Sequence, residues 1–150
     1  MAIYLSNRQK ALPIRSGLLR RRLIKILKEL SLAGAELSVS LVTDEDIRQL
    51  NRDYRGQDRT TNVLSFSLRE EGTEPRPKKA PEALGDIVVS TETIIREAGS
   101  YGYTNGGMLY FYLIHGLTHL LGYNHEKSFE AAARQEAETE RLWNLIDHSI

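Results

Sequence analysis

The stretch Leu37-Ser38-Val39-Ser40-Leu41, followed by Thr43-Asp44-Glu45-Asp46, indicates a strand that leads directly into a helix. Apolar and polar residues alternate over 37–41, which is the period of a strand with one buried face. Threonine followed by acidic residues is typical of a helix N-terminus, and this helix is predicted to run to about residue 54. A strand that alternates with a helix is the unit from which mixed α/β domains are built.

Segments on both sides of this stretch continue the alternation. Apolar residues recur at helical spacing between Leu19 and Leu30, and short apolar runs at 3–5, 62–68 and 84–90 predict three more strands. Behind the last strand, the sequence predicts helices at about 92–98, 107–121 and 129–146.

These elements together predict an α+β (mixed α/β) fold in a single domain that spans residues 1–150. We expect a small, mainly parallel mixed sheet of about four strands, packed with five or so helices. Residues 69–83 hold three of the four prolines and predict a surface loop inside this domain. The apolar periodicity leaves the order of the strands open.

Composition and length exclude several classes of protein. The 150 residues are 41% hydrophobic and 27% charged, as in ordinary globular domains. The absence of cysteine excludes disulfide frameworks, iron–sulfur clusters and cysteine nucleophiles, and leaves His and carboxylates as metal ligands. No signal peptide is visible, and the most apolar run is too short and too polar for a membrane span. We therefore expect a cytoplasmic protein without a membrane partner.

Three of the four histidines fall in one short segment, as His115, His119 and His125. His115 and His119 are four residues apart, so on a helix their imidazoles lie on one face and can bind one ion. Gly122 is placed to end that helix in a left-handed turn, which would bring His125 back as a third ligand. Three imidazoles favour one Zn²⁺ ion, or a similar borderline metal, over Mg²⁺ or Ca²⁺, and they leave a coordination position for water or substrate. His148 belongs to no cluster and is predicted to be a solvated tail residue.

The same histidine spacing occurs in the extended zinc-protease motif, where a glutamate general base follows the first histidine. Gly116 takes that position in this chain. The proton acceptor must then come from elsewhere in the chain or from the substrate. Peptide hydrolysis is therefore less favoured than a reaction on a substrate whose own charge binds the metal.

The formal net charge of zero hides an asymmetry between the two ends of the chain. Residues 1–30 hold eight basic side chains and one acidic side chain, whereas residues 125–150 hold three basic and six acidic. The basic face of the first long helix includes Arg20, Arg21 and Lys25. Such a face is a candidate binding site for phosphates.

A second basic cluster consists of Arg52, Arg55 and Arg59, which flank a loop that contains Gly56. Arginine forks match the geometry of a phosphodiester better than lysines do. This cluster is a second candidate for contact with a nucleic acid.

Four segments give the chain a family resemblance, in the order 50–59, 63–66, 84–87 and 115–125. With these segments, the chain resembles the YbeY-type endoribonucleases, a family of rRNA maturation factors. The resemblance covers nearly the whole chain. It implies a single-strand-specific, metal-dependent endoribonuclease that matures the 3′ end of the small-subunit rRNA and acts in ribosome quality control. It also implies RNA, and the ribosome or its small-subunit proteins, as partners.

By position, the resemblance implies that His115, His119 and His125 hold the zinc ion and that Arg59 lies beside it. We expect Arg59 to neutralise the charge that grows on the phosphate in the transition state. The reaction would take place in a cleft between the histidine helix and the sheet.

Three positions depart from the commonest family pattern. Asn62 and Asn124 stand where aspartate is usual, and Thr118 stands where leucine is usual. Asn124 can still orient a ligand or a water molecule by hydrogen bonding, and Asp86 is a second candidate for that role or for a proton relay.

Two alternatives stay open at this point. The protein can be a zinc-dependent hydrolase of another class, such as a peptidase or an amidohydrolase. It can also be a non-catalytic ribosome-assembly module in which the zinc is structural, which would require a fourth protein ligand.

Overall fold

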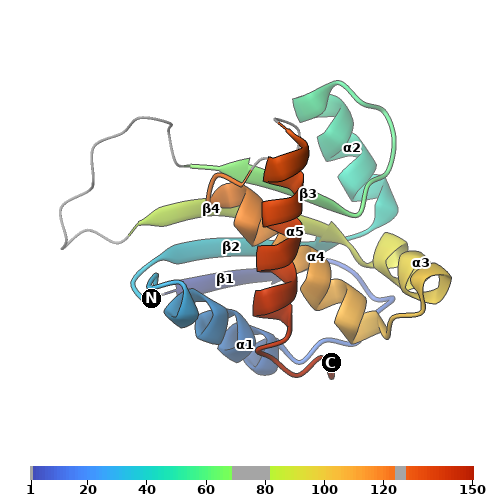
Figure 1. Cartoon of the computed structure of the whole chain (residues 1–150). Coiled ribbons are helices and arrows are strands. Elements are labelled where there is room, and N and C mark those ends of the chain that lie inside the picture. The colour runs from blue at the N-terminus through green and yellow to red at the C-terminus, as the bar shows by residue number, and fades with distance from the viewer. Residues whose placement is uncertain (1, 69–81, 124–127) are drawn as a thin grey trace.

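The computed structural model describes residues 2–68, 82–123 and 128–150. Strands and helices alternate as far as β3, and three helices follow the last strand (Figure 1). No helix in this described part of the chain is long and apolar enough to cross a membrane. The strands are β1 (Ala2–Asn7), β2 (Glu36–Val42), β3 (Val63–Ser67) and β4 (Ala83–Ser90), and the helices are α1 (Ser16–Glu29), α2 (Asp44–Arg55), α3 (Thr91–Tyr101), α4 (Asn105–Leu120) and α5 (Phe129–Trp143). Most of the predicted loop at 69–83 lies outside the described residues.

The four strands form one sheet in the order β1-β2-β4-β3. β1, β2 and β4 are parallel, so that Val39 lies between Leu5 on one neighbour and Ile87 on the other. β3 runs antiparallel to β4 at the outer edge. The predicted mixed, mainly parallel sheet of four strands is therefore confirmed.

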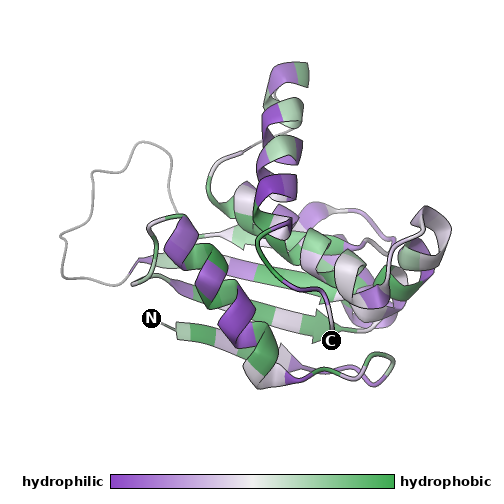
Figure 2. Ribbon diagram, turned by 60° about the horizontal axis from the view of Figure 1, so that its bottom comes forward, coloured by the Kyte–Doolittle hydropathy of each residue, from purple (hydrophilic) through white to green (hydrophobic). Residues whose placement is uncertain are grey.

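The two faces of the sheet are covered differently. On one face, alternate strand residues such as Leu37 and Ile87 join the main core with side chains of α1, α3 and α4, and α5 packs on α4. Figure 2 shows hydrophilic residues on the part of the α1 ribbon that faces away from the sheet. On the opposite face, α2 covers a smaller apolar cluster, in which Ile47 contacts Val42 and Leu64.

One carboxylate joins the beginnings of α2 and α3. Thr43 caps α2 as predicted, because its hydroxyl oxygen accepts a backbone N–H of the first turn at 3.2 Å. Asp44 accepts hydrogen bonds from the hydroxyls of Ser90 and Thr93, each at 2.6 Å, and pairs with Arg96 at 2.8 Å. Burial alone would raise the pKa of Asp44, but the hydrogen bonds from Arg96, Ser90 and Thr93 outweigh it and hold the pKa below its usual value.

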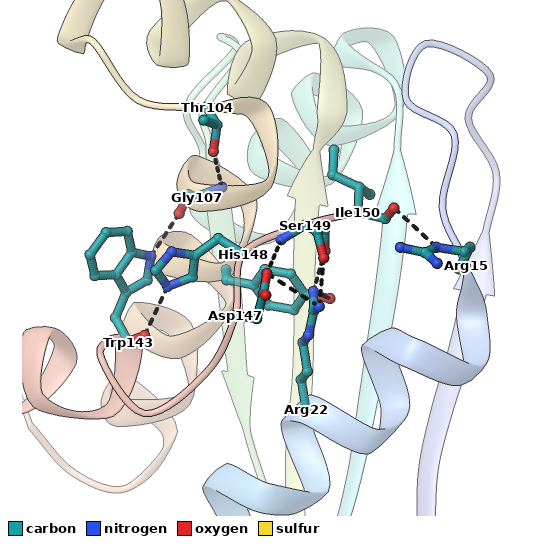
Figure 3. A network of polar contacts seen from close by, with 10 residues as sticks. Arg15, Arg22, Thr104, Gly107, Trp143, Asp147, His148, Ser149 and Ile150 are labelled. Carbon is teal, nitrogen blue, oxygen red and sulfur yellow. Dashed lines mark hydrogen bonds and ion pairs between the residues drawn. The ribbon is translucent and has the colours of Figure 1, made fainter.

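The C-terminal segment folds back onto α1 (Figure 3). The Arg22 guanidinium donates to the carbonyl oxygen and the hydroxyl of Ser149 and to the Tyr110 hydroxyl on α4. The Lys25 ammonium donates to the Leu145 carbonyl at 2.8 Å. Part of the basic face of α1 therefore binds backbone carbonyls of the protein's own C-terminal segment.

The prediction for His148 is wrong. Its ring stacks on Trp143 with the ring centroids 3.8 Å apart, and its Nε2 lies 2.8 Å from the Trp143 carbonyl oxygen. The helix α5 ends at Trp143, three residues before the predicted end, and the chain turns there toward α1. Helical periodicity does not reveal that His148 stacks on Trp143, because the two residues lie on opposite sides of the turn that ends α5.

Candidate active site

The helix α4 exposes one stripe of an otherwise buried surface. The helix begins where the Thr104 hydroxyl accepts the backbone N–H of Gly107 at 2.9 Å. Most of its later residues are buried, but two adjacent aromatic residues and two histidines are half-buried. The histidines follow the aromatic pair by three to four and by seven to eight residues, so the four side chains share one broad face. We call this group the histidine stripe; it consists of Phe111, Tyr112, His115 and His119.

Aromatic rings surround the first histidine of the stripe. Phe111 stacks on His115, with centroids 6.3 Å apart and an interplanar angle of 12°. Tyr112 meets the same imidazole edge to face, at 6.4 Å and 82°. These two rings restrict the orientations that the His115 ring can take.

Gly116 brings the histidine stripe close to the edge strand β3. A Cβ added at Gly116 would lie 2.9 Å from Ile87 Cγ2, 3.0 Å from Ser65 Oγ and 3.2 Å from Val63 Cγ2. The Ser65 hydroxyl donates to the Gly116 carbonyl at 3.1 Å. Position 116 therefore faces the sheet, and the glutamate of the zinc-protease motif would not fit there.

A buried polar contact holds the other side of α4 to α5. Thr118 donates to the His115 carbonyl at 2.7 Å, and Gln135 of α5 donates to Thr118 Oγ1 at 3.1 Å. Both side chains are fully buried, at 0% exposure. The threonine that departs from the family pattern is thus matched by a glutamine on the facing helix.

The described part of the proposed zinc site consists of His115 and His119. Gly122 has φ +98°, which confirms the predicted left-handed turn after the helix. His125 and Asn124 lie outside the described residues, and within 2–68, 82–123 and 128–150 no group of three or more His, Cys, Asp or Glu side chains is placed to hold a metal. Two half-buried imidazoles one helical turn apart are a donor pair that suits zinc. The residues present therefore fit a zinc ion that takes its third ligand from beyond Gly122.

The arginine cluster lies at the end of α2 and in the loop that leads to β3. Gly56 ends α2 with φ +68°, and Asn51 donates to the Arg59 carbonyl at 3.0 Å, which fixes the loop. The Arg59 guanidinium donates from Nε and Nη2 to Gln57 Oε1, at 3.0 and 2.7 Å. This contact orients the guanidinium of an exposed side chain. Arg52 and Arg55 are also exposed, and Arg52 lies 3.4 Å from the Asp53 carboxylate.

A cluster that sequence reasoning missed connects this loop to the histidine stripe. Asn62, three residues after Arg59, donates from Nδ2 to both carboxylate oxygens of Glu97, at 3.2 and 3.3 Å. Burial and the neighbouring Glu97 carboxylate raise the pKa of Tyr112 on α4, so the Asn62–Glu97 pair lies near this ring. These contacts place the end of the Arg59 loop beside the stripe, and no motif in the sequence pairs α3 with β3.

Asp86 lies on the other face of the sheet from the histidines. It is exposed, and it pairs with Phe66 across β3 and with Ser38 across β2. Its neighbour Ile87 points to the opposite face, where it packs near Gly116. The structure therefore does not bring the Asp86 carboxylate to the stripe, because successive side chains of a strand alternate between faces.

The basic helix α1 is also remote from the stripe. It packs by β1, at one edge of the sheet, whereas Gly116 of α4 lies against β3 at the other edge (Figure 1). Arg20 and Arg21 are exposed there, and Lys25 is bonded to the C-terminal segment. The basic face of this helix in the sequence suggested these residues as phosphate contacts. Their distance from the histidines depends on the strand order, which the sequence left open.

Comparisons with known proteins agree with the family suggested by the sequence. Residues 4–145 match the family model described as endoribonuclease YbeY. An endoribonuclease YbeY from Geobacter sulfurreducens is 40% identical over 99% of this chain and 97% of its own length. One from Moorella thermoacetica is also 40% identical, over 91% of this chain and 94% of its own length.

A solved structure has the same fold. The solution structure of a protein from Thermotoga maritima has a TM-score of 0.62 and 30% sequence identity, and the match covers 96% of this chain and 91% of that one. Sequence and structure agree over nearly the same residues, and this chain therefore belongs to the endoribonuclease YbeY family.

Proposed function

We propose that this protein is a zinc-dependent endoribonuclease that cleaves single-stranded RNA at the histidine stripe, beside β3. The observation that carries the proposal is the pair His115 and His119, which emerge half-buried and one turn apart from a helix whose other side is core. Family membership supplies RNA as the substrate class. Within the cell, the proposed substrate is the 3′ end of the small-subunit rRNA.

His115 and His119 would hold the zinc ion together with His125. When bound, zinc lowers the pKa of a water molecule and polarises a phosphate oxygen. Packing of α4 on the sheet at Gly116 holds the helix that carries both histidines, and the rings of Phe111 and Tyr112 contact His115.

Arg59 is proposed to neutralise the charge that grows on the phosphate in the transition state. Its contact with Gln57 fixes the direction of the guanidinium, and its loop continues into Asn62 beside the stripe. A donor that is oriented before the reaction stabilises developing charge without reorganisation. Arg52 and Arg55, on the last turn of α2, are proposed to contact flanking phosphates of the strand.

The packing at Gly116 favours a phosphodiester substrate over a peptide. Because a Cβ at position 116 would lie only 2.9 Å from Ile87, closer than van der Waals contact, the glutamate base of zinc proteases has no place in this fold. A phosphate brings its own negative charge to the metal and to Arg59. We also propose that the protein acts in the cytoplasm on ribosomal RNA, with the small subunit as its partner.

The experiment is a cleavage assay on the purified full chain, combined with metal analysis. The substrates are a labelled single-stranded RNA, the same RNA in a duplex, and an unstructured peptide of similar charge. We expect about one zinc ion per chain, cleavage of the single strand alone, loss of cleavage with a chelator, and recovery when zinc is added back. Intact RNA with cleaved peptide, or intact RNA with a melting temperature that depends on zinc, would overturn the proposal.

A further inference from the structure

The face of α2 that packs on the sheet ends in an exposed tyrosine. Ile47, Asn51 and Tyr54 are spaced by four and by three residues, so they share one face of the helix. Ile47 and Asn51 are buried, at 0% and 2% exposure, whereas Tyr54 is 70% exposed. Tyr54 therefore lies where the packed face of α2 reaches solvent.

Tyr54 contacts Phe66 on the edge strand β3. The two ring centroids are 5.5 Å apart, and the interplanar angle of 64° makes the contact edge to face. Phe66 is half-buried and packs on the small apolar cluster that α2 covers. We call these two residues the aromatic pair. Phe66 braces Tyr54 from the sheet, while most of the surface of Tyr54 stays open to solvent.

The segment that carries Tyr54 is positively charged. Residues 48–59 hold four arginines and two aspartates, a net charge of +2. Asn51, one turn before Tyr54, donates to the Arg59 carbonyl at 3.0 Å, so the Arg59 loop adjoins the same turn of α2. The Asp86 carboxylate lies opposite Phe66 on β4 and is outnumbered by the arginines. An exposed ring in a cationic segment is complementary to a nucleic acid, because bases stack on rings and phosphates pair with arginine.

The aromatic pair lies across the edge strand from the end of α4. Ser65 bonds to α4, and successive side chains of a strand alternate, so Phe66 points to the other face of β3. A Cβ added at Gly85 would contact both the Phe66 carbonyl and Leu120 Cδ2, which places the end of the histidine helix level with Phe66. A single strand that crosses the edge of β3 can therefore have one base at Tyr54 and a nearby phosphate at the histidine stripe.

We propose that Tyr54, braced by Phe66, binds a base of single-stranded RNA by stacking, and that this contact makes the protein prefer unpaired RNA. The inference rests on the proposed function, because it names a further contact for the same substrate. An unpaired base can stack on an aromatic side chain, whereas the bases of a duplex are already stacked on one another. Such stacking tolerates any sequence, because every base has a flat face.

The first measurement is RNA binding by the purified full chain, followed by fluorescence anisotropy. The ligands are a labelled, unstructured single-stranded RNA and an abasic strand of the same length and charge, and a chelator keeps the RNA intact. Tyr54→Ala is expected to bind the RNA about 5-fold or more weakly than the wild type and to bind the abasic strand equally well. Tyr54→Phe keeps the ring and should bind both strands as the wild type does.

The matched control is Tyr4→Ala. Tyr4 is 56% exposed on β1, and its neighbour Ile3 joins the main core, so Tyr4 lies on the same face of the sheet as Phe66 but at the other edge. The control should bind both strands as the wild type does. Wild-type affinity in folded Tyr54→Ala, equal weakening on the abasic strand, or equal weakening in the control would overturn the stacking role.

The second measurement is the ratio of the affinities for single-stranded RNA and for the same RNA in a duplex. Tyr54→Ala should lower this ratio about 5-fold, because only the single strand loses a contact. An unchanged ratio would contradict the inference. Binding that depends on Tyr54, by a wild type that leaves RNA intact in the presence of zinc, would uphold the stacking role and overturn the proposed ribonuclease. Cleavage of single-stranded RNA by a Tyr54→Ala protein of wild-type affinity would do the reverse.

Discussion

The Ser65 hydroxyl donates to the carbonyl oxygen of Gly116, at 3.1 Å, and joins the edge strand β3 to the turn of α4 that carries His115. The same side chain would lie 3.0 Å from a Cβ at position 116. Close approach of helix and strand, and not chemistry at the metal, therefore explains why glycine follows the first histidine.

Replacement of Gly116 by alanine is expected to destabilise the protein. The added methyl would press on Ile87 at 2.9 Å, and overpacking of this kind costs about 1–3 kcal/mol, of which the better helix propensity of alanine returns up to about 1 kcal/mol. Gly99→Ala on α3 is the matched control, because no atom lies within 4 Å of its added Cβ. Urea unfolding should show opposite signs for the two changes. A Gly116→Ala protein stabilised as much as Gly99→Ala would refute this account of the packing.

Thr118 and Gln135 are expected to behave as a coupled pair. Thr118→Val removes the closest acceptor of the buried Gln135 amide, which keeps a longer contact to the His115 carbonyl at 3.4 Å, and should cost about 1 kcal/mol in unfolding free energy. The double variant Thr118→Val with Gln135→Leu removes both polar groups and should recover most of that loss. Additive losses in a double-mutant cycle, measured by chemical denaturation, would contradict the coupling.

Asp44 is expected to make the stability depend on pH in the acid range. Its pKa in the folded protein lies below the unfolded value of 3.8, so its contribution is complete above that pH and is lost as pH falls through the folded pKa. Asp44→Asn should be less stable than the wild type at pH 7, and the difference should shrink when unfolding is measured near pH 3. A difference of the same size at both pH values would show that the Asp44 charge is not what stabilises the α2–α3 junction.

Arg59 is expected to affect the rate of cleavage, kcat, whereas the α1 arginines are expected to affect RNA binding and its dependence on salt. Loss of one oriented donor to the transition state lowers kcat by about 10²- to 10³-fold, which is the prediction for Arg59→Ala. The double change Arg20→Ala with Arg21→Ala removes charges at the far edge of the sheet, so kcat should be unchanged. Each phosphate contact that is lost should make the slope of log binding constant against log salt concentration less steep by about 0.7. Cleavage rates on single-stranded RNA at several salt concentrations separate the two effects. A lower kcat in the α1 variant would place these arginines at the site.

The sequence predicted the elements well because periodicity and caps are local. The alternation over 37–41 and the cap at Thr43 both appear as predicted, and the left-handed turn at Gly122 does as well. The strand order could not be predicted, because three parallel strands and one antiparallel strand bury similar apolar residues in several arrangements. That order places the basic helix α1 by β1, at the edge of the sheet opposite the histidines.

The sequence predicted site residues only where they lie on the same helix. His115 and His119 are spaced by one helical turn, so their common face follows from the sequence alone. The contact between Asn62 and Glu97 joins the start of β3 to α3, and no spacing within one segment reveals it. For Lys25 the sequence was misleading. Its charge suggested a contact with phosphate, but its ammonium donates to the Leu145 backbone carbonyl.

The most direct test of the central claim compares His119→Ala with His148→Ala. Both histidines are half-buried, but His148 stacks on Trp143 and lies outside the proposed site. The measurement is the rate of chelator-sensitive cleavage of a single-stranded RNA by each folded variant and by the wild type. The account predicts that His119→Ala loses cleavage and zinc binding, while His148→Ala cleaves like the wild type. Full, chelator-sensitive cleavage by His119→Ala would contradict a zinc-centred ribonuclease at the histidine stripe.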